Sequence, residues 1–150
     1  MKAVVYYNPG FGYGHWSDSP NRTINFEGAT EEDLQQQILQ WYRKASNCAI
    51  DGQDFIEALT VMNDDAFNEG ESLAVIYKVE IDGRVVYEGI EPIVEKSKAS
   101  GEYVMTALKH PDGTIDKIPY QDLYGYDPMT EVPQDPAADE LYNLINKKLS

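Results

Sequence analysis

The residues suited to catalysis or metal binding are few and widely spaced. His15, Ser17 and Asp18 are the residue types of a nucleophilic triad, but neighbours in sequence do not by themselves converge as a triad requires. A zinc site needs three or four ligands at short spacings. The only two histidines, His15 and His110, lie far apart, with the single cysteine, Cys48, between them. We therefore expect no enzymatic activity, no metal site and no cofactor.

A glycine-rich stretch follows the first predicted strand. Gly10, Gly12 and Gly14 alternate with other residues, whereas a dinucleotide-binding loop has its third glycine three positions after the second and opens a helix. Nucleotide binding is therefore not expected here. Two interpretations remain, a loop whose aromatic rings fold back on the core and an exposed contact loop. The candidate contact residues are Phe11, Tyr13, His15 and Trp16.

Charge is the most informative property of the chain. It has 26 acidic and 12 basic residues, and a formal net charge of −14. Such a surface repels nucleic-acid phosphates and anionic lipid, and it attracts basic protein surfaces. Two windows, residues 51–77 and 118–146, contain seven and six acidic residues and no basic residue. Each window is either a solubilising surface or a binding face for a basic partner.

The candidate partner-binding residues come from these two windows. The first window supplies carboxylates. The second combines carboxylates with tyrosines, whose rings give a large contact area at low entropic cost. The alternative is that these rings pack the segment onto its own domain. The candidates are Asp64, Asp65, Glu69, Glu71, Tyr120, Asp122, Tyr124, Tyr126 and Asp127.

Length and composition indicate one acidic domain spanning residues 1–150, because 42% hydrophobic residues suffice for one core. No apolar run approaches about 18 residues, so no transmembrane helix is expected. The apolar run at the N-terminus is too short for a signal peptide. A single cysteine favours a reducing compartment, and we predict the cytoplasm. The oligomeric state does not follow from the sequence.

The strongest structural signal is a β-hairpin at residues 72–90. Two β-branched and aromatic runs flank Asp82-Gly83, a pair that readily takes the positive φ angles of a type I′ turn. If Ile81 faces Arg84, strict alternation makes Val79 face Val86. One face of the hairpin is then expected to be buried, and it carries Leu73, Val75, Tyr77, Val79, Ile81 and Val86.

Further strands are predicted from β-branched residues and turn signals. Residues 2–7 form a strand that stops at Asn8-Pro9-Gly10, and residues 23–26 form a short strand that pairs with it. A second hairpin spans residues 102–120, around a type I turn at residues 110–113.

Helices are predicted from periodicity and capping. One begins after the N-cap Thr30, and its core face is Leu34, Ile38, Trp41 and Ala45. Residues 51–62 fit a helix or a strand, with helix favoured, and residues 139–149 fit a helix. The segments between these elements, residues 63–71, 91–100 and 121–137, are predicted to be connectors or an extended arm.

These patterns predict an α+β fold, with a mostly antiparallel sheet of about five strands, two hairpins, and two or three helices on one face. The favoured function is a cytoplasmic inhibitor that blocks a basic, nucleic-acid-handling protein, without binding nucleic acid or membrane itself. Phage counter-defence proteins and toxin-immunity proteins are of this type. The alternative is a small-molecule-binding protein or small enzyme with a pocket at the loop of residues 10–16.

Overall fold

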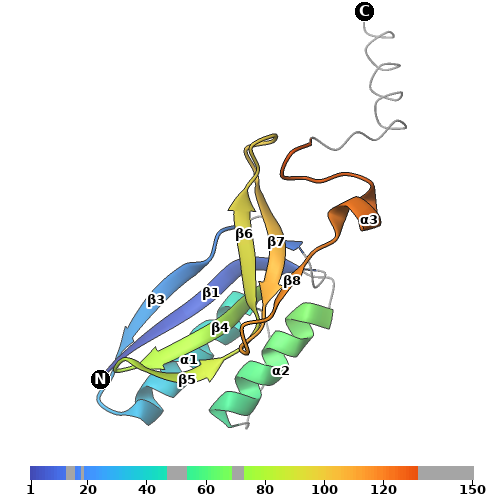
Figure 1. The fold of residues 1–150 in the computed structure, drawn as a ribbon. Helices are drawn as coiled ribbons and strands as arrows, with labels where there is room; N and C mark the ends of the chain where they lie inside the picture. The colour runs from blue at the N-terminus through green and yellow to red at the C-terminus, as the bar shows by residue number, and fades with distance from the viewer. Residues whose placement is uncertain (13–15, 18, 47–53, 69–72, 132–150) are drawn as a thin grey trace, which may run out of the picture. The chain divides into compact units, whose positions relative to one another are not determined.

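The computed structural model describes residues 1–12, 16–17, 19–46, 54–68 and 73–131 (Figure 1). The chain divides into two compact units. One is formed by Met1–Lys96 and Glu102–Ile118, and the other by Ser97–Gly101 and Pro119–Ser150. The first unit contains two antiparallel sheets and two long helices. The predicted α+β class is therefore confirmed, although the strands divide between two sheets.

The main sheet is built around β1 (Lys2–Gly12). This strand pairs antiparallel with β3 (Arg22–Glu27) on one side and with β4 (Leu73–Ile81) on the other. β4 then pairs with β5 (Arg84–Glu88), and the two-residue strand β2 (Trp16–Ser17) pairs with the far end of β1. The two predicted N-terminal strands are confirmed. The first continues past its predicted stop because β4 still pairs with it there, through Phe11 and Leu73.

Two helices, α1 (Glu31–Ser46) and α2 (Phe55–Asn68), pack against one face of this sheet. Helix is therefore confirmed for the ambiguous residues 55–62. The predicted acidic connector is wrong for residues 63–68, which continue α2 because Met62 and Asn63 prolong its buried face. The core between sheet and helices includes Ala3, Val5, Leu34, Ile38, Leu39, Tyr42, Phe55, Leu59, Met62, Ile76, Val79 and Ile81.

The start of α1 is as predicted, and its buried face is partly different. The Thr30 hydroxyl accepts a hydrogen bond from the Asp33 N–H at 3.1 Å, which confirms the N-cap. Ala45, predicted to lie in the core, is exposed. Tyr42 is fully buried in its place, because its hydroxyl reaches hydrogen-bonding partners on α2 and β4.

The central hairpin turns where the sequence predicted. Asp82 and Gly83 have φ values of 50° and 78°, as a type I′ turn requires, and Ile81 pairs with Arg84. The predicted partnership of Val79 with Val86 is wrong. Val79 pairs with Tyr87 because a β-bulge inserts one extra residue into β5.

A second irregularity lies in β4, opposite β1. Tyr6 pairs with Lys78 and Tyr7 with Ile76, so the intervening Tyr77 has no partner on β1. The alternation of β4 therefore reverses at this point. The predicted buried face is wrong for Val75, which packs in a second cluster with Met105, and Ile76 faces the helices instead.

The bulge is accompanied by a buried polar network at Ile76. The pairing of β4 with β5 begins only at Lys78, so no strand receives the backbone groups of Ile76 on that side. The Tyr42 hydroxyl accepts the Ile76 N–H at 3.3 Å, and the Asn63 amide donates to the Ile76 carbonyl at 2.7 Å. Asn63 also accepts from the Tyr42 hydroxyl and donates to that of Tyr87. Side chains from α1 and α2 thus form the hydrogen bonds with the Ile76 backbone that a neighbouring strand would otherwise form.

The second sheet has three strands, β6 (Glu91–Lys96), β7 (Tyr103–Lys109) and β8 (Ile115–Lys117). The predicted second hairpin is confirmed by the pairing of β7 with β8 and by the turn hydrogen bond from the Gly113 N–H to the His110 carbonyl, at 2.9 Å. The predicted connector at residues 91–100 is wrong for β6. The residues of β6 pair with β7 along its whole length. This strand pairing outweighs the mixed charge on which the connector was predicted.

The second unit contains α3 (Tyr120–Tyr124), which ends at Gly125 in a left-handed conformation. The predicted extended arm is wrong for residues 121–124, because Gly125 can cap a short helix there. The Ser97 hydroxyl donates to the Pro128 carbonyl at 2.6 Å and ties the two segments of this unit together. The helix predicted at residues 139–149 lies outside the described residues.

Candidate functional site

The base-free window at residues 51–77 contains helix α2, which has one buried and one exposed face. Phe55, Ala58, Leu59 and Met62 are buried against the sheet and α1. The opposite face is exposed and carries Ile56, Glu57, Thr60, Val61 and Asp64. Ile56 and Val61 are 40% and 36% exposed, so two aliphatic side chains lie among the polar residues of this face.

A shallow hollow of about 470 Å³ opens beside the first turn of α2 and the first half of α1. Its apolar floor is formed by Leu39 and Phe55, and carboxylates of Glu31, Glu32 and Asp54 surround it. Glu31 is engaged by the Arg84 guanidinium, whose Nη2 lies 3.1 and 3.2 Å from the two carboxylate oxygens. The carboxylates of Glu32 and Asp54 form no ion pair with a described residue.

We call the exposed face of α2, together with the acidic rim of this hollow, the helix-layer acidic surface. It is defined by Glu32, Asp54, Ile56, Glu57, Thr60, Val61 and Asp64. Asp64 is the one predicted contact residue of the first window whose side chain the structure describes, and it is exposed. Asp65 belongs to α2, but its side chain lies outside the description. Glu69 and Glu71 lie outside the described residues altogether.

The predicted contact residues of the second window belong to the other compact unit. Tyr120 is buried, and burial raises its pKa to about 12. Tyr124 is 49% exposed, with its ring centroid 5.8 Å from that of Tyr120. Asp122 is exposed as well, whereas Tyr126 is half-buried. Of the predicted contact residues of this segment, Asp122 and Tyr124 are therefore the two that are exposed.

Asp127, predicted to be a partner contact, has a structural role in a turn. Its carboxylate accepts the Met129 N–H at 3.0 Å, and its backbone carbonyl accepts the Glu131 N–H at 2.8 Å. The Asp127 N–H in turn donates to the Glu131 carboxylate at 3.2 Å. Asp127 thus stabilises a turn, and its carboxylate is already partly satisfied.

The candidate contact loop is described only at its ends. Phe11 and Gly12 pair with Ser17 and Trp16, so the backbone on both sides is strand where an irregular loop was predicted. The extension of β1 along β4 supports this pairing. Tyr13 and His15 lie outside the described residues, and so do the side chains of Phe11 and Trp16. The pocket predicted at this loop therefore also lies outside the description.

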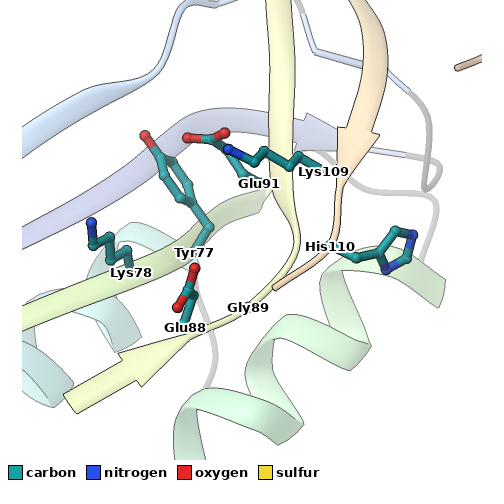
Figure 2. Close-up of a pocket in the computed structure, with 7 residues that line it drawn as sticks. All are labelled: Tyr77, Lys78, Glu88, Gly89, Glu91, Lys109 and His110. Atoms are coloured by element: carbon teal, nitrogen blue, oxygen red, sulfur yellow. The ribbon is translucent and has the colours of Figure 1, made fainter. Parts of the chain in front are cut away.

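A second hollow, of about 110 Å³, lies where β4 and β5 approach β6 and β7 (Figure 2). It is lined by Tyr77, Lys78, Glu88, Gly89, Glu91, Lys109 and His110. The sequence does not indicate this site, because strict alternation places Tyr77 on the buried face and Glu91 falls in a predicted connector. Strand pairing brings Glu91 opposite Lys109, and the bulge releases Tyr77 from the face predicted for it.

Chemistry of the hydrolytic or metal-assisted kind has little support in the described part of the chain. His15, Asp18 and Cys48 lie outside the description. The described residues contain no group of three His, Cys, Asp or Glu side chains placed to hold a metal ion. The His110 Nε2 lies 2.6 Å from a carboxylate oxygen of the exposed Asp116.

Comparison of the chain with protein family models, with curated proteins and with solved structures gives no match. Among the described helices, none is both long and apolar enough to cross a membrane.

Proposed function

We propose that this protein acts in the cytoplasm as an inhibitor that binds and blocks a basic, nucleic-acid-handling protein, in the manner of phage counter-defence or toxin-immunity proteins. One observation carries the proposal. The helix-layer acidic surface combines carboxylates that have no ion-pair partner among the described residues with two exposed aliphatic side chains, Ile56 and Val61. A purely solubilising surface has no need of the exposed aliphatic residues.

Each component of this surface has a separate physical role in binding. The carboxylates attract a basic partner over about 10 Å at 0.1 M salt, which raises the association rate. Ile56 and Val61 lose their exposed area to a partner, and this contact slows dissociation. The carboxylates would occupy positions that nucleic-acid phosphates otherwise take on the partner. Asp122 and Tyr124 offer the same combination on the second unit.

The first experiment is a pull-down from host lysate at low and high salt, which identifies a partner. Association kinetics are then measured for wild type and for the double variant Glu57→Lys with Asp64→Lys. Because both side chains are exposed, the variant should fold normally. We expect its association rate at low salt to fall by about tenfold or more, and the difference to shrink at high salt.

A matched control separates local from global charge effects. Glu27→Lys with Glu95→Lys changes the net charge by the same amount at two exposed strand positions away from α2. Ile56→Ala with Val61→Ala should instead raise the dissociation rate. If the α2 reversals and the control reversals slow association equally, the charge acts only through its total, and the proposed binding surface is refuted.

A further inference from the structure

The main sheet has an open edge at β3, which pairs with β1 and with no other described strand (Figure 1). The Gly28 N–H donates to the Met1 carbonyl at 3.1 Å, and the Met1 amino group donates to the Gly28 carbonyl at 2.9 Å. The hydrogen-bonding direction alternates along an antiparallel strand. The backbone N–H and carbonyl groups of Thr23, Asn25 and Glu27 therefore face away from β1, towards the open edge.

This edge lacks most of the features that prevent edge strands from pairing. Such features include a proline, a bulge or a charge in the middle of the strand. Residues 23–26 contain neither a proline nor a charge, and β3 pairs with β1 without a register shift. On the helix side, Ile24 and Phe26 are only half-buried, and the ring centroid of Trp41 on α1 lies 6.2 Å from that of Phe26. A strand that pairs here also covers this apolar area.

We propose that β3 pairs antiparallel with β3 of a second copy of this chain, so that the two main sheets join across a two-fold axis. This axis is perpendicular to the sheet and keeps every side chain on its own face. The outward backbone groups meet when Asn25 faces Asn25 of the second copy and Thr23 faces Glu27. Ile24 then faces Phe26 of the other copy on the helix side. This inference is independent of the proposed inhibitor function.

Charge complementarity selects this register. Arg22 lies on the same face as Ile24, is exposed and forms no ion pair with a described residue. In the proposed register Arg22 faces Gly28 of the second copy. The Asp33 carboxylate occupies the place of a side chain at Gly28, because a Cβ there would lie 2.6 Å from the Asp33 Oδ2. The Arg22 guanidinium of each copy thus meets the Asp33 carboxylate of the other. A register centred on Ile24 would instead place Arg22 opposite Phe26.

One side chain already contacts the open edge, but it does not prevent this pairing. The Gln37 amide donates to the Glu27 carbonyl at 2.9 Å. A carbonyl has a second lone pair, which can accept the Thr23 N–H of the other copy. A contact between two six-residue strands is small, so we expect a weak dimer that dissociates on dilution.

The test is sedimentation equilibrium of the full chain from about 1 µM to about 1 mM, where weak interfaces dissociate. The net charge of −14 on each copy opposes association, so the salt concentration is kept at about 0.15 M to screen it. We expect a monomer at the lowest concentration and a dimer at the highest. Amide hydrogen exchange, measured by NMR over this range, locates the contact. The Thr23 and Asn25 amides should exchange about tenfold or more slowly in the dimer, whereas those of Ile24 and Phe26 face β1 and should be protected throughout.

Two substitutions at Asn25 form a matched pair. Asn25→Pro removes the N–H at the centre of the contact but leaves β3 paired with β1, because that N–H faces away from β1. We expect it to weaken the dimer by about tenfold or more, since the facing carbonyl loses its donor. Asn25→Ala keeps the N–H and should leave the dimer unchanged.

An exchange of charges tests the register. Arg22→Glu and Asp33→Arg should each weaken the dimer, and the two substitutions combined should restore it. Within one copy, Arg22 and Gly28 lie about 20 Å apart along the strand, so only a contact between copies explains the rescue.

Three outcomes would overturn the assignment. The first is a monomer at every concentration, which would leave the edge to a strand of another protein or to none. The second is a dimer in which the Thr23 and Asn25 amides exchange as fast as in the monomer. The third is the absence of rescue when the Arg22 and Asp33 substitutions are combined. If Asn25→Pro does not fold, amide exchange in the wild type decides in its place.

Discussion

Replacing Asn63 with alanine should reveal how much the polar network contributes to the stability of the fold. The Asn63 side chain is 6% exposed and forms hydrogen bonds with the Tyr42 hydroxyl, the Ile76 carbonyl and the Tyr87 hydroxyl. Alanine removes all three. Tyr42 keeps its bond from the Ile76 N–H, but the Ile76 carbonyl loses the partner that compensates for the missing strand.

The expected loss can be worked out from these groups. A buried polar group left without a partner costs about 1–3 kcal/mol. The buried Ile76 carbonyl should contribute this full amount to the loss of stability. The half-buried Tyr87 hydroxyl should contribute less, because water can replace Asn63 as its hydrogen-bonding partner. Adding a small cavity term, we expect the free energy of unfolding to fall by about 2–4 kcal/mol, a large share of the roughly 5–15 kcal/mol typical of a domain.

Urea denaturation followed by circular dichroism measures this change. Asn25→Ala is the control, because it removes the same side chain from an exposed position on β3, where a change within about 0.5 kcal/mol is expected. Tyr87→Phe combined with Asn63→Ala should cost less than the sum of the two single changes, since both delete the same hydrogen bond. An Asn63→Ala midpoint equal to that of the control would show that the network contributes nothing, and the reasoning would be refuted.

Three further predictions follow from other parts of the molecule. Gly83→Val should destabilise the protein by roughly 1 kcal/mol or more, because a β-branched residue resists φ of 78°, and an unchanged denaturation midpoint would contradict the turn assignment. Between pH 10 and pH 12 stability should fall, since Tyr77 releases its proton at a pKa of 10.0 when unfolded and about 12 when folded; thermal unfolding of Tyr77→Phe should show a smaller fall. Dialysis against EDTA should leave the melting temperature unchanged, and a drop restored by one divalent ion would reveal a metal site formed outside the described residues.

The parts of the fold that could be predicted are those decided by local chemistry. The Asp82-Gly83 turn and the Thr30 cap depend on a few neighbouring residues, and both are confirmed. The register of β4 could not be predicted, because the bulges at Tyr77 and Val86 are set by packing against β1 and the helices. A single inserted residue then reversed the faces assigned to Val75 and Ile76.

The candidate sites were predicted in part. The excess of acidic residues indicates the window that contains α2 as a candidate surface, and Asp64, a predicted contact residue there, is exposed. The same count could not show that Ile56 and Val61 stay exposed, since a count of charges says nothing about apolar side chains. It could not separate Asp127, which caps a turn, from Asp122, which does not. The hollow at Tyr77 was not predicted, because it depends on the pairing of β6, predicted to be a connector, with β7.

The central position of β1 has a consequence for synthesis on the ribosome. Once Glu27 has been made, β1 and β3 can pair, but the other neighbour of β1 is β4, which ends at Ile81. At roughly 5–20 residues per second, the nascent hairpin waits roughly 3 to 11 s with one edge open. Its apolar side, which includes Ala3 and Val5, is uncovered during that time. This interval is when a chaperone, or mispairing with another nascent chain, would compete with folding.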